Sequence, residues 1–278
     1  MKKVLVSMIF SCLSLATMLA RENSLPLIDS EDISAWSGKV LANREIKLSG
    51  EFSFETFGKY PTETIAKEFI PVSPDKTYSL SGFMRSLSAD NPASGYLGLK
   101  MYDKDKRYIG ICNVATLTKQ SALSAPAAIG DLQVLVKLNL EWLEIKHSAI
   151  AFNVQKDYSD LPNFDLSPQV SEFIQDGENL KVVLKSALKK DYPMGTLVRL
   201  HSPWGAPLYW IAQGWMTNEW QEFKTILKGE AEQGTSKNKF WRGTKYVKPF
   251  FWFGNWDRIP KEGARLLVDQ IRFDEIQE

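Results

Sequence analysis

The sequence is poor in cysteine and histidine, with two of each among its 278 residues. Cys12 falls in an apolar N-terminal segment that reads as a signal peptide, so the exported chain would keep only Cys112. A single cysteine cannot form an internal disulfide. His147 and His201 are too far apart in the sequence for a local metal motif. We therefore expect the fold to be held by its hydrophobic core, which a chain of this length can build.

An excess of charge of one sign is also lacking. Lys and Arg total 34 against 33 for Asp and Glu, which gives a formal net charge of +1. Nucleic-acid-binding surfaces usually show as a strong positive bias, so we expect no nucleic-acid partner. After residue 20, no apolar run approaches the roughly 18 residues of a membrane span. The chain is therefore expected to be globular after signal cleavage, with no indication of its oligomeric state.

Signatures of common enzymes are missing as well. The sequence has neither a Gly-x-Ser-x-Gly nor a His-Glu-x-x-His motif. A glycoside hydrolase needs only two carboxylates at a suitable separation, so that class stays open. A jelly-roll polysaccharide lyase also stays open, with His201 as base, Arg199 neutralising a substrate carboxylate and Tyr209 as acid.

The N-terminal residues have the pattern of a secretory signal. Lys2 and Lys3 precede an apolar run from Val4 to Ala20, which an abruptly polar segment follows. We expect cleavage near Ala20, giving a signal peptide over 1–20. An uncleaved anchor and a lipoprotein with Cys12 as lipid acceptor are the alternatives. The sequence contains no Asn-x-Ser/Thr sequon, so we expect a bacterial protein that is periplasmic or secreted.

Most of the remaining sequence alternates polar and apolar residues with the period of two that is typical of strands. In the segment 95–102, Tyr96, Gly98, Lys100 and Tyr102 share one side and leave the apolar residues on the other. Strands are predicted at 77–84, 95–102, 108–111, 142–152, 181–184, 196–201, 208–212, 222–227, 246–253 and 265–273. A short helix is predicted over 167–175, and long loops over 115–130 and 155–180. This pattern predicts an all-β, antiparallel β-sandwich, as one domain over 21–278 with long loop insertions.

Three segments resemble a known family. They are 69–83 (FIPVSPDKTYSLSGF), 96–106 (YLGLKMYDKDK) and 264–273 (ARLLVDQIRF). Together they are similar to the opening and closing strands of galactose-binding-like jelly rolls, the fold of many carbohydrate-binding modules. The resemblance implies a jelly roll whose two ends pair in space. It also implies a structural Ca²⁺, for which Asp269 of the last strand is the matching residue and Glu51 or Glu55 the guessed partner.

Tryptophan, in contrast to cysteine and histidine, is abundant. Seven of the nine Trp residues lie between Gly195 and Pro260. A sugar ring has an apolar face that an exposed indole can cover, while polar side chains bond to its hydroxyl groups. The alternative is that these rings are core residues, so their sequence context has to separate the two roles.

Two strands and three loops supply the candidate ligand-binding residues. On 246–253, alternation places Trp252 with Lys248 on a half-open face, and on 196–201 it places Arg199 with His201. Loop contexts favour Trp204, Trp256 and Trp241. Tyr209, Arg242 and Asn255 complete the predicted site.

We expect an exported, non-catalytic protein that binds a polysaccharide or glycan by Trp stacking and by hydrogen bonds from Arg and Asn. A polysaccharide lyase or glycoside hydrolase, and a cell-surface structural or adhesion protein, are the alternatives.

Overall fold

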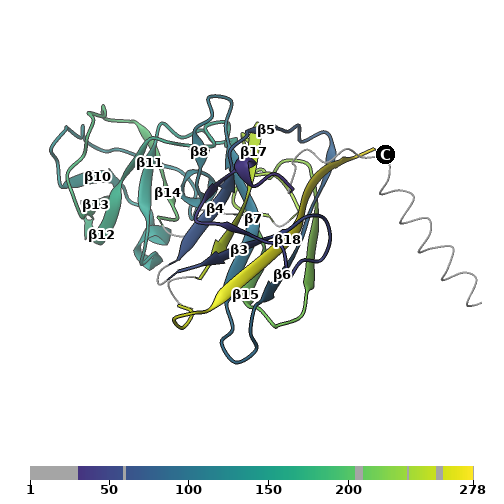
Figure 1. Ribbon diagram of the computed structural model, residues 1–278. Helices are drawn as coiled ribbons and strands as arrows, with labels where there is room; N and C mark the ends of the chain where they lie inside the picture. Colours follow the sequence, from purple (N-terminus) through teal and green to yellow (C-terminus); the bar gives the residue numbers. More distant parts are fainter. Residues whose placement is uncertain (1–30, 59–60, 204–208, 237, 255–258, 278) are drawn as a thin grey trace, which may run out of the picture.

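The computed structural model describes residues 31–58, 61–203, 209–236, 238–254 and 259–277. The predicted all-β antiparallel fold is confirmed: two sheets pack face to face as a jelly-roll β-sandwich, and a third sheet lies beside them (Figure 1). The three helices within these ranges are short, η1 (Ile33–Ala35), α2 (Ile111–Val114) and η2 (Leu140–Glu144). None of the described helices has the length and apolarity needed to cross a bilayer.

The two sheets of the sandwich combine strands from both ends of the chain. The seven-stranded sheet contains β1 (Trp36–Gly38), β4 (Thr62–Ala66), β17 (Tyr246–Phe253), β7 (Ser94–Tyr102) and β15 (Tyr209–Trp215), in that order. Short β5 (Ile70–Pro71) pairs with β17, and β8 (Tyr108–Ile109) pairs with β7. The five-stranded sheet runs β16 (Gln221–Lys228), β6 (Thr77–Ser86), β18 (Arg265–Ile276), β3 (Ser53–Phe57) and β2 (Leu41–Asn43). The pairings β18–β3 and β17–β4 join the two ends of the fold, as the sequence motifs imply.

Alternation along the central strands forms the sandwich core. Leu97 and Phe251 of the larger sheet and Leu266, Val268 and Phe273 of the smaller one are fully buried in one cluster. Their neighbours in sequence point away from this core, because successive side chains of a strand leave opposite faces. The larger sheet therefore has a second face, opposite the core, which carries the candidate site.

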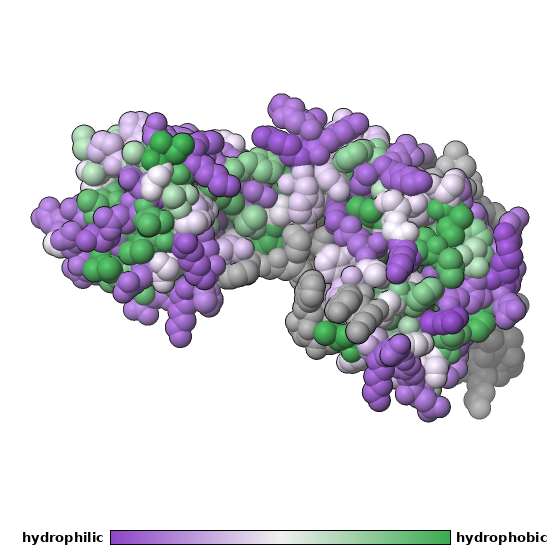
Figure 2. Space-filling model, turned by 60° about the vertical axis from the view of Figure 1, so that its left-hand side comes forward, coloured by the Kyte–Doolittle hydropathy of each residue, from purple (hydrophilic) through white to green (hydrophobic). Residues whose placement is uncertain are grey.

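The chain between the sandwich strands β8 and β15 forms a lobe of its own. Its sheet runs β10 (Gln133–Lys137), β13 (Asn179–Leu184), β12 (Leu166–Asp176), β11 (Ala149–Phe152), β14 (Leu197–His201) and β9 (Ser121–Ala122). A bridge between Leu123 and Val136 joins the β9 and β10 ends, so the sheet curls round on itself. Its interior is a second hydrophobic cluster that includes Trp142, Phe152 and Leu200. On the face shown in Figure 2, the surface is hollowed between this lobe and the sandwich.

Two predictions for this lobe are wrong. The segment predicted as a helix over 167–175 is strand β12, and much of the predicted loop 155–180 is the β12–β13 hairpin. The register of β12 shifts between Val170 and Glu172, where the strand has a bulge. A bulge inserts a residue into the alternation, so Val170 and Phe173, which both pack on the core of the lobe, are three positions apart and imitate a helical period. The prediction of one domain over 21–278 stays a prediction.

Candidate functional site

The second face of the seven-stranded sheet, here called the outer face, carries aromatic and charged side chains in rows across neighbouring strands. The registers of β4, β17, β7, β15 and β8 define its members. They are Glu63 and Ile65 from β4, Tyr246, Lys248, Phe250 and Trp252 from β17, Tyr96, Gly98, Lys100 and Tyr102 from β7, Gln213 and Trp215 from β15, and Tyr108 from β8. The face contains aromatic surface and hydrogen-bonding groups together.

The first row is organised around the carboxylate of Glu63. The Nε1 of Trp252 donates a hydrogen bond to Glu63 Oε2 at 2.7 Å, and Lys100 Nζ lies 2.7 Å from the same oxygen. On the other side of Trp252, the Tyr96 ring lies edge-on at 6.1 Å, and Gln213 Nε2 donates to the Tyr96 hydroxyl at 3.3 Å. Because both the indole N–H and the ring edge are held, the half-buried Trp252 ring is fixed in orientation.

An exposed indole lies in the neighbouring row, opposite Ser94 of β7. Trp215 lies two residues beyond Gln213 on β15, on the same side of the strand, and 50% of its surface is exposed. Sequence reasoning did not select this residue. An exposed indole ring of this kind can cover the C–H face of a sugar.

The next polar row places two lysines directly opposite each other. Lys248 of β17 and Lys100 of β7 are register partners, an arrangement of like charges that destabilises a sheet. Lys100 is neutralised by Glu63, whereas Lys248 Nζ lies 4.1 Å from the centroid of the Phe69 ring. Burial lowers the pKa of Lys248, and the positive charges of Lys100 and Lys106 lower it further.

The last row is aromatic. The Tyr102 ring lies 4.9 Å from the Phe69 ring and 5.7 Å from the Tyr108 ring, and Tyr246 is 6.1 Å from Phe69. Burial raises the pKa of Tyr102 to about 12 and raises that of Tyr108 further. Both phenols are therefore protonated at neutral pH and can donate hydrogen bonds. The buried hydroxyl oxygen of Tyr108 has no hydrogen-bond partner among the described residues.

Of the residues predicted for the site, Trp252 lies on the outer face. Its companion Lys248 is there too, as the alternation of residues 246–253 predicts. Trp204, Asn255 and Trp256 lie outside the described residues, and so does the side chain of Tyr209, whose backbone begins β15. Their predicted roles stay predictions.

The placement predicted for Trp241 needs correction, whereas the role predicted for Arg242 stays a prediction. Trp241 is only 1% exposed and packs in the sandwich core, so its ring is not presented to solvent. The turn around it is packed against the inserted lobe, since a Cβ on Gly243 would lie 2.3 Å from Pro162. Arg242 is half-buried, and its Nη1 donates to the carbonyl oxygen of Glu232 at 3.2 Å.

Arg199 and His201 were predicted on a half-open strand face, but they are buried, at 1% and 0% exposure. Arg199 Nη2 lies 2.8 Å from Asp160 Oδ2, and Arg199 Nε donates to His201 Nε2 at 3.2 Å. His201 Nδ1 lies 2.8 Å from the carbonyl oxygen of Cys112, in helix α2. This chain of contacts ties the inserted lobe to the segment that leaves the sandwich. It is part of the junction between the lobes and is away from the outer face.

The residues predicted to bind calcium make other contacts in this structure. The Asp269 carboxylate accepts hydrogen bonds from the backbone N–H groups of Leu48 and Gln270, at 2.6 and 2.7 Å. Glu51 is exposed and lies beside Arg44, with 3.6 Å between its Oε2 and the guanidinium. Calcium binding stays a prediction, for which the described residues supply no group of three or more His, Cys, Asp or Glu ligands.

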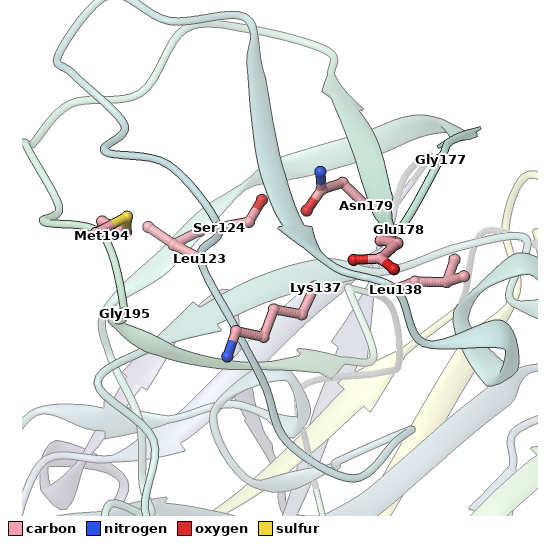
Figure 3. Close-up of a pocket in the computed structure, with 9 residues that line it drawn as sticks. All are labelled: Leu123, Ser124, Lys137, Leu138, Gly177, Glu178, Asn179, Met194 and Gly195. Atoms are coloured by element: carbon pink, nitrogen blue, oxygen red, sulfur yellow. The ribbon is translucent and has the colours of Figure 1, made fainter.

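A pocket of about 700 Å³ opens at one end of the inserted sheet (Figure 3). Leu123, Leu138 and Met194 form its apolar lining, and the side chains of Ser124 and Asn179 point toward each other across it. Lys137 and Glu178 are its charged residues. The pocket has no aromatic ring to cover a sugar, so the outer face is the stronger candidate for ligand binding.

Comparisons with known proteins return similar structures only. No protein-family model and no curated protein sequence matches the chain. Among solved structures, it is similar to the xylan-binding domain CBM22-1 of Paenibacillus barcinonensis Xyn10C, with 9% identity and a TM-score of 0.38 over 92% of this chain and 97% of that one. A family 16 carbohydrate-binding module has 8% identity and a TM-score of 0.32, over 90% and 99%. The C-terminal family 22 module of Clostridium thermocellum Xyn10B has 7% identity and a TM-score of 0.34, over 88% of each chain.

These structures belong to the class that the sequence motifs resemble. All three TM-scores are below 0.5, so the similarity establishes neither a ligand nor binding residues for this chain.

Proposed function

We propose that this protein binds a polysaccharide on its outer face without altering it. The observation that carries the proposal is the half-buried Trp252 and the exposed Trp215, from neighbouring rows of one sheet face, together with the polar groups of Glu63, Lys100 and Gln213. Rings cover the apolar face of a sugar, and the adjacent carboxylate, ammonium and amide groups bond to its hydroxyls.

The rows of the outer face also favour an extended ligand. Successive side chains on one face of a strand are about 6.6–6.8 Å apart, so Trp215, Trp252 and the aromatic row around Tyr102 span several sugar units. A chain of sugars could contact all of these rows, whereas a monosaccharide would use one.

Trp252→Ala is expected to weaken polysaccharide binding at least tenfold, because truncating an anchoring aromatic residue costs about 2 kcal/mol or more and about 1.4 kcal/mol is tenfold in affinity. Trp252→Phe keeps a ring and should retain more of the affinity. Isothermal titration calorimetry, on polymers chosen by screening the wild type, measures both effects.

Trp220→Ala is the matched control for that experiment. Trp220 precedes β16, away from the outer face, with the Arg85 guanidinium 5.7 Å from its ring. Thermal melts of all three variants separate lost contacts from lost folding. If Trp252→Ala and the wild type bind every polymer with equal affinity, the ligand does not bind on the outer face and the assignment is wrong.

The lyase alternative is not supported by the positions of its proposed residues. Arg199 and His201 are buried and bonded to Asp160 and to the Cys112 carbonyl, so a polymer cannot reach them in this conformation. Export remains part of the proposal, since the signal-peptide prediction over 1–20 falls outside the described residues. We propose a periplasmic or secreted location on the sequence pattern alone.

A further inference from the structure

We propose that the sugar bound on the outer face carries a negative charge, either a carboxylate or a sulfate ester, which is held by Lys248 and Lys106 beside the aromatic row. This inference rests on the proposed function and adds the chemical class of the ligand to it. The two lysines come from different parts of the chain. Lys248 lies on β17, and Lys106 is in the turn between β7 and β8.

The two ammonium groups converge on one ring. Lys248 Nζ lies 4.1 Å and Lys106 Nζ 5.0 Å from the centroid of Phe69. Lys106 Nζ is also 5.5 Å from the centroid of the Tyr246 ring. Aromatic faces attract cations but carry no net charge, so these contacts position the ammonium groups without neutralising them.

The charges around this ring do not balance. Glu63 neutralises Lys100, Asp105 pairs with Lys104 and Asp103 pairs with Arg107. Among the described residues, no carboxylate lies within 4 Å of Lys248 or Lys106. The positive charges of Lys248 and Lys106 therefore remain without a counter-charge among the described residues, and Lys248 is the register partner of Lys100, whose charge Glu63 offsets.

A fold would gain stability by replacing Lys248 with a neutral residue, because like charges directly opposite each other destabilise a sheet. Burial and the charges of Lys100 and Lys106 also lower the pKa of Lys248, so its positive charge is unfavourable in the folded protein. An anionic group placed between Lys248 and Lys106 would offset this cost, and a neutral sugar would not.

The surroundings specify a sugar rather than a free anion. Tyr102, Tyr246 and Phe69 offer ring surface next to the ammonium groups, and the Tyr108 hydroxyl has no described partner. Lysine is a point charge without the fork geometry of arginine, so the site fits a carboxylate and a sulfate equally. With a net charge of only +1 for the chain, the positive potential is local to this row.

The test compares polymers that differ only in charge. The first pair is polygalacturonate and its fully methyl-esterified form, and the second is a sulfated galactan and its desulfated form. We expect the mature wild-type protein to bind at least one charged polymer ten times more tightly than its neutral form, with an affinity that falls as salt rises. The preferred pair identifies the anionic group as carboxylate or sulfate.

Variants then assign the effect to the two lysines. Lys248→Gln combined with Lys106→Gln should reduce the affinity for the charged polymer to that for the neutral form. Lys104→Gln is the matched control, because this lysine lies in the same turn but is paired with Asp105, and it should bind as the wild type does. Lys248→Gln should leave the melting temperature unchanged or raise it. If Lys248 had a structural role, the same substitution would lower the melting temperature.

Three outcomes would overturn the inference. If charged and neutral polymers bind equally and the binding depends on Trp252, the ligand class is wrong while the proposed function stands. If no polymer of either pair and none from the wider screen binds, the proposed function itself fails. If single-stranded RNA binds with the same dependence on Lys248 and Lys106 and no charged polymer does, the face recognises a nucleic acid and not a sugar.

Discussion

Asp160→Ala is expected to lower the free energy of unfolding by about 3–5 kcal/mol, because it leaves a buried guanidinium without its counter-charge. The side chains of Arg199 and Asp160 are 2% and 6% exposed, and their charged atoms lie 2.8 Å apart. Arg199 also packs on the Tyr158 ring, with 4.8 Å between Arg199 Cζ and the ring centroid. Arg199 Nη1 donates to the carbonyl oxygen of Gln155 at 3.3 Å. Neither contact supplies the lost negative charge.

Urea denaturation of Asp160→Ala beside wild type measures this loss. The double variant Asp160→Ala with Arg199→Met should recover much of it, since replacing both partners of a buried pair by apolar groups is often nearly neutral. Glu275→Ala is the control for an ion pair in water: Lys76 and Glu275 are 2.9 Å apart but exposed, so stability should not change measurably. A loss below about 1 kcal/mol for Asp160→Ala would show that Arg199 reaches solvent or another carboxylate.

The same variant reports on the junction between the lobes. Asp160 Oδ2 accepts from Asn163 Nδ2 at 3.1 Å, and the backbone oxygen of Asn163 accepts from Asn113 Nδ2 at 2.9 Å. Asn113 belongs to helix α2, which directly follows β8 and therefore the aromatic row with Tyr108. Loss of Asp160 is thus expected to loosen the inserted lobe at its junction with the sandwich.

Part of the outer face could be predicted from local sequence. Alternation correctly grouped Tyr96, Gly98, Lys100 and Tyr102 on one side of β7, and Lys248 with Trp252 on one side of β17. It could not show that these two strands are neighbours, because about 150 residues separate them and strand pairing is not encoded in either pattern. The Glu63 carboxylate, which joins the two sets, was missed for the same reason.

Burial was harder to predict than strand position. Trp241 lies between turn-like residues, a context that favours exposure, but the turn itself is covered by the inserted lobe. Arg199 lies on a strand with alternating polarity, which is typical of a sheet with one face in water. Strand β14 has neighbours on both edges, β11 and β9, and the segment 155–160 covers the face that carries Arg199. The covering residues 155–162 fall in the segment 155–180 that the sequence pattern indicated as a loop.

His201 is expected to make the stability of the protein depend on pH between 6.5 and about 4. Its Nδ1 donates to the carbonyl oxygen of Cys112, and its Nε2 accepts from Arg199, so the imidazole is held in its neutral form. Burial lowers the pKa of His201 to about 4, although the Cys112 carbonyl favours the charged ring, and the Arg199 charge lowers it further. A second proton on Nε2 would face the guanidinium directly.

The sign follows from proton uptake by the unfolded chain. Above pH 6.5 the imidazole is neutral in both the folded and the unfolded state, so it adds no pH dependence to the free energy of unfolding. As pH falls below 6.5, the unfolded chain binds a proton while the folded protein does not until about pH 4. The free energy of unfolding therefore decreases across that window, by about 3 kcal/mol in total from this residue. His201→Asn keeps an N–H donor for the Cys112 carbonyl but does not titrate, so its urea midpoint should fall less between pH 7 and pH 4 than that of the wild type. Parallel losses in the two proteins would mean that the ring takes up its proton in the folded state without cost, and that the contact with Arg199 does not hold it neutral.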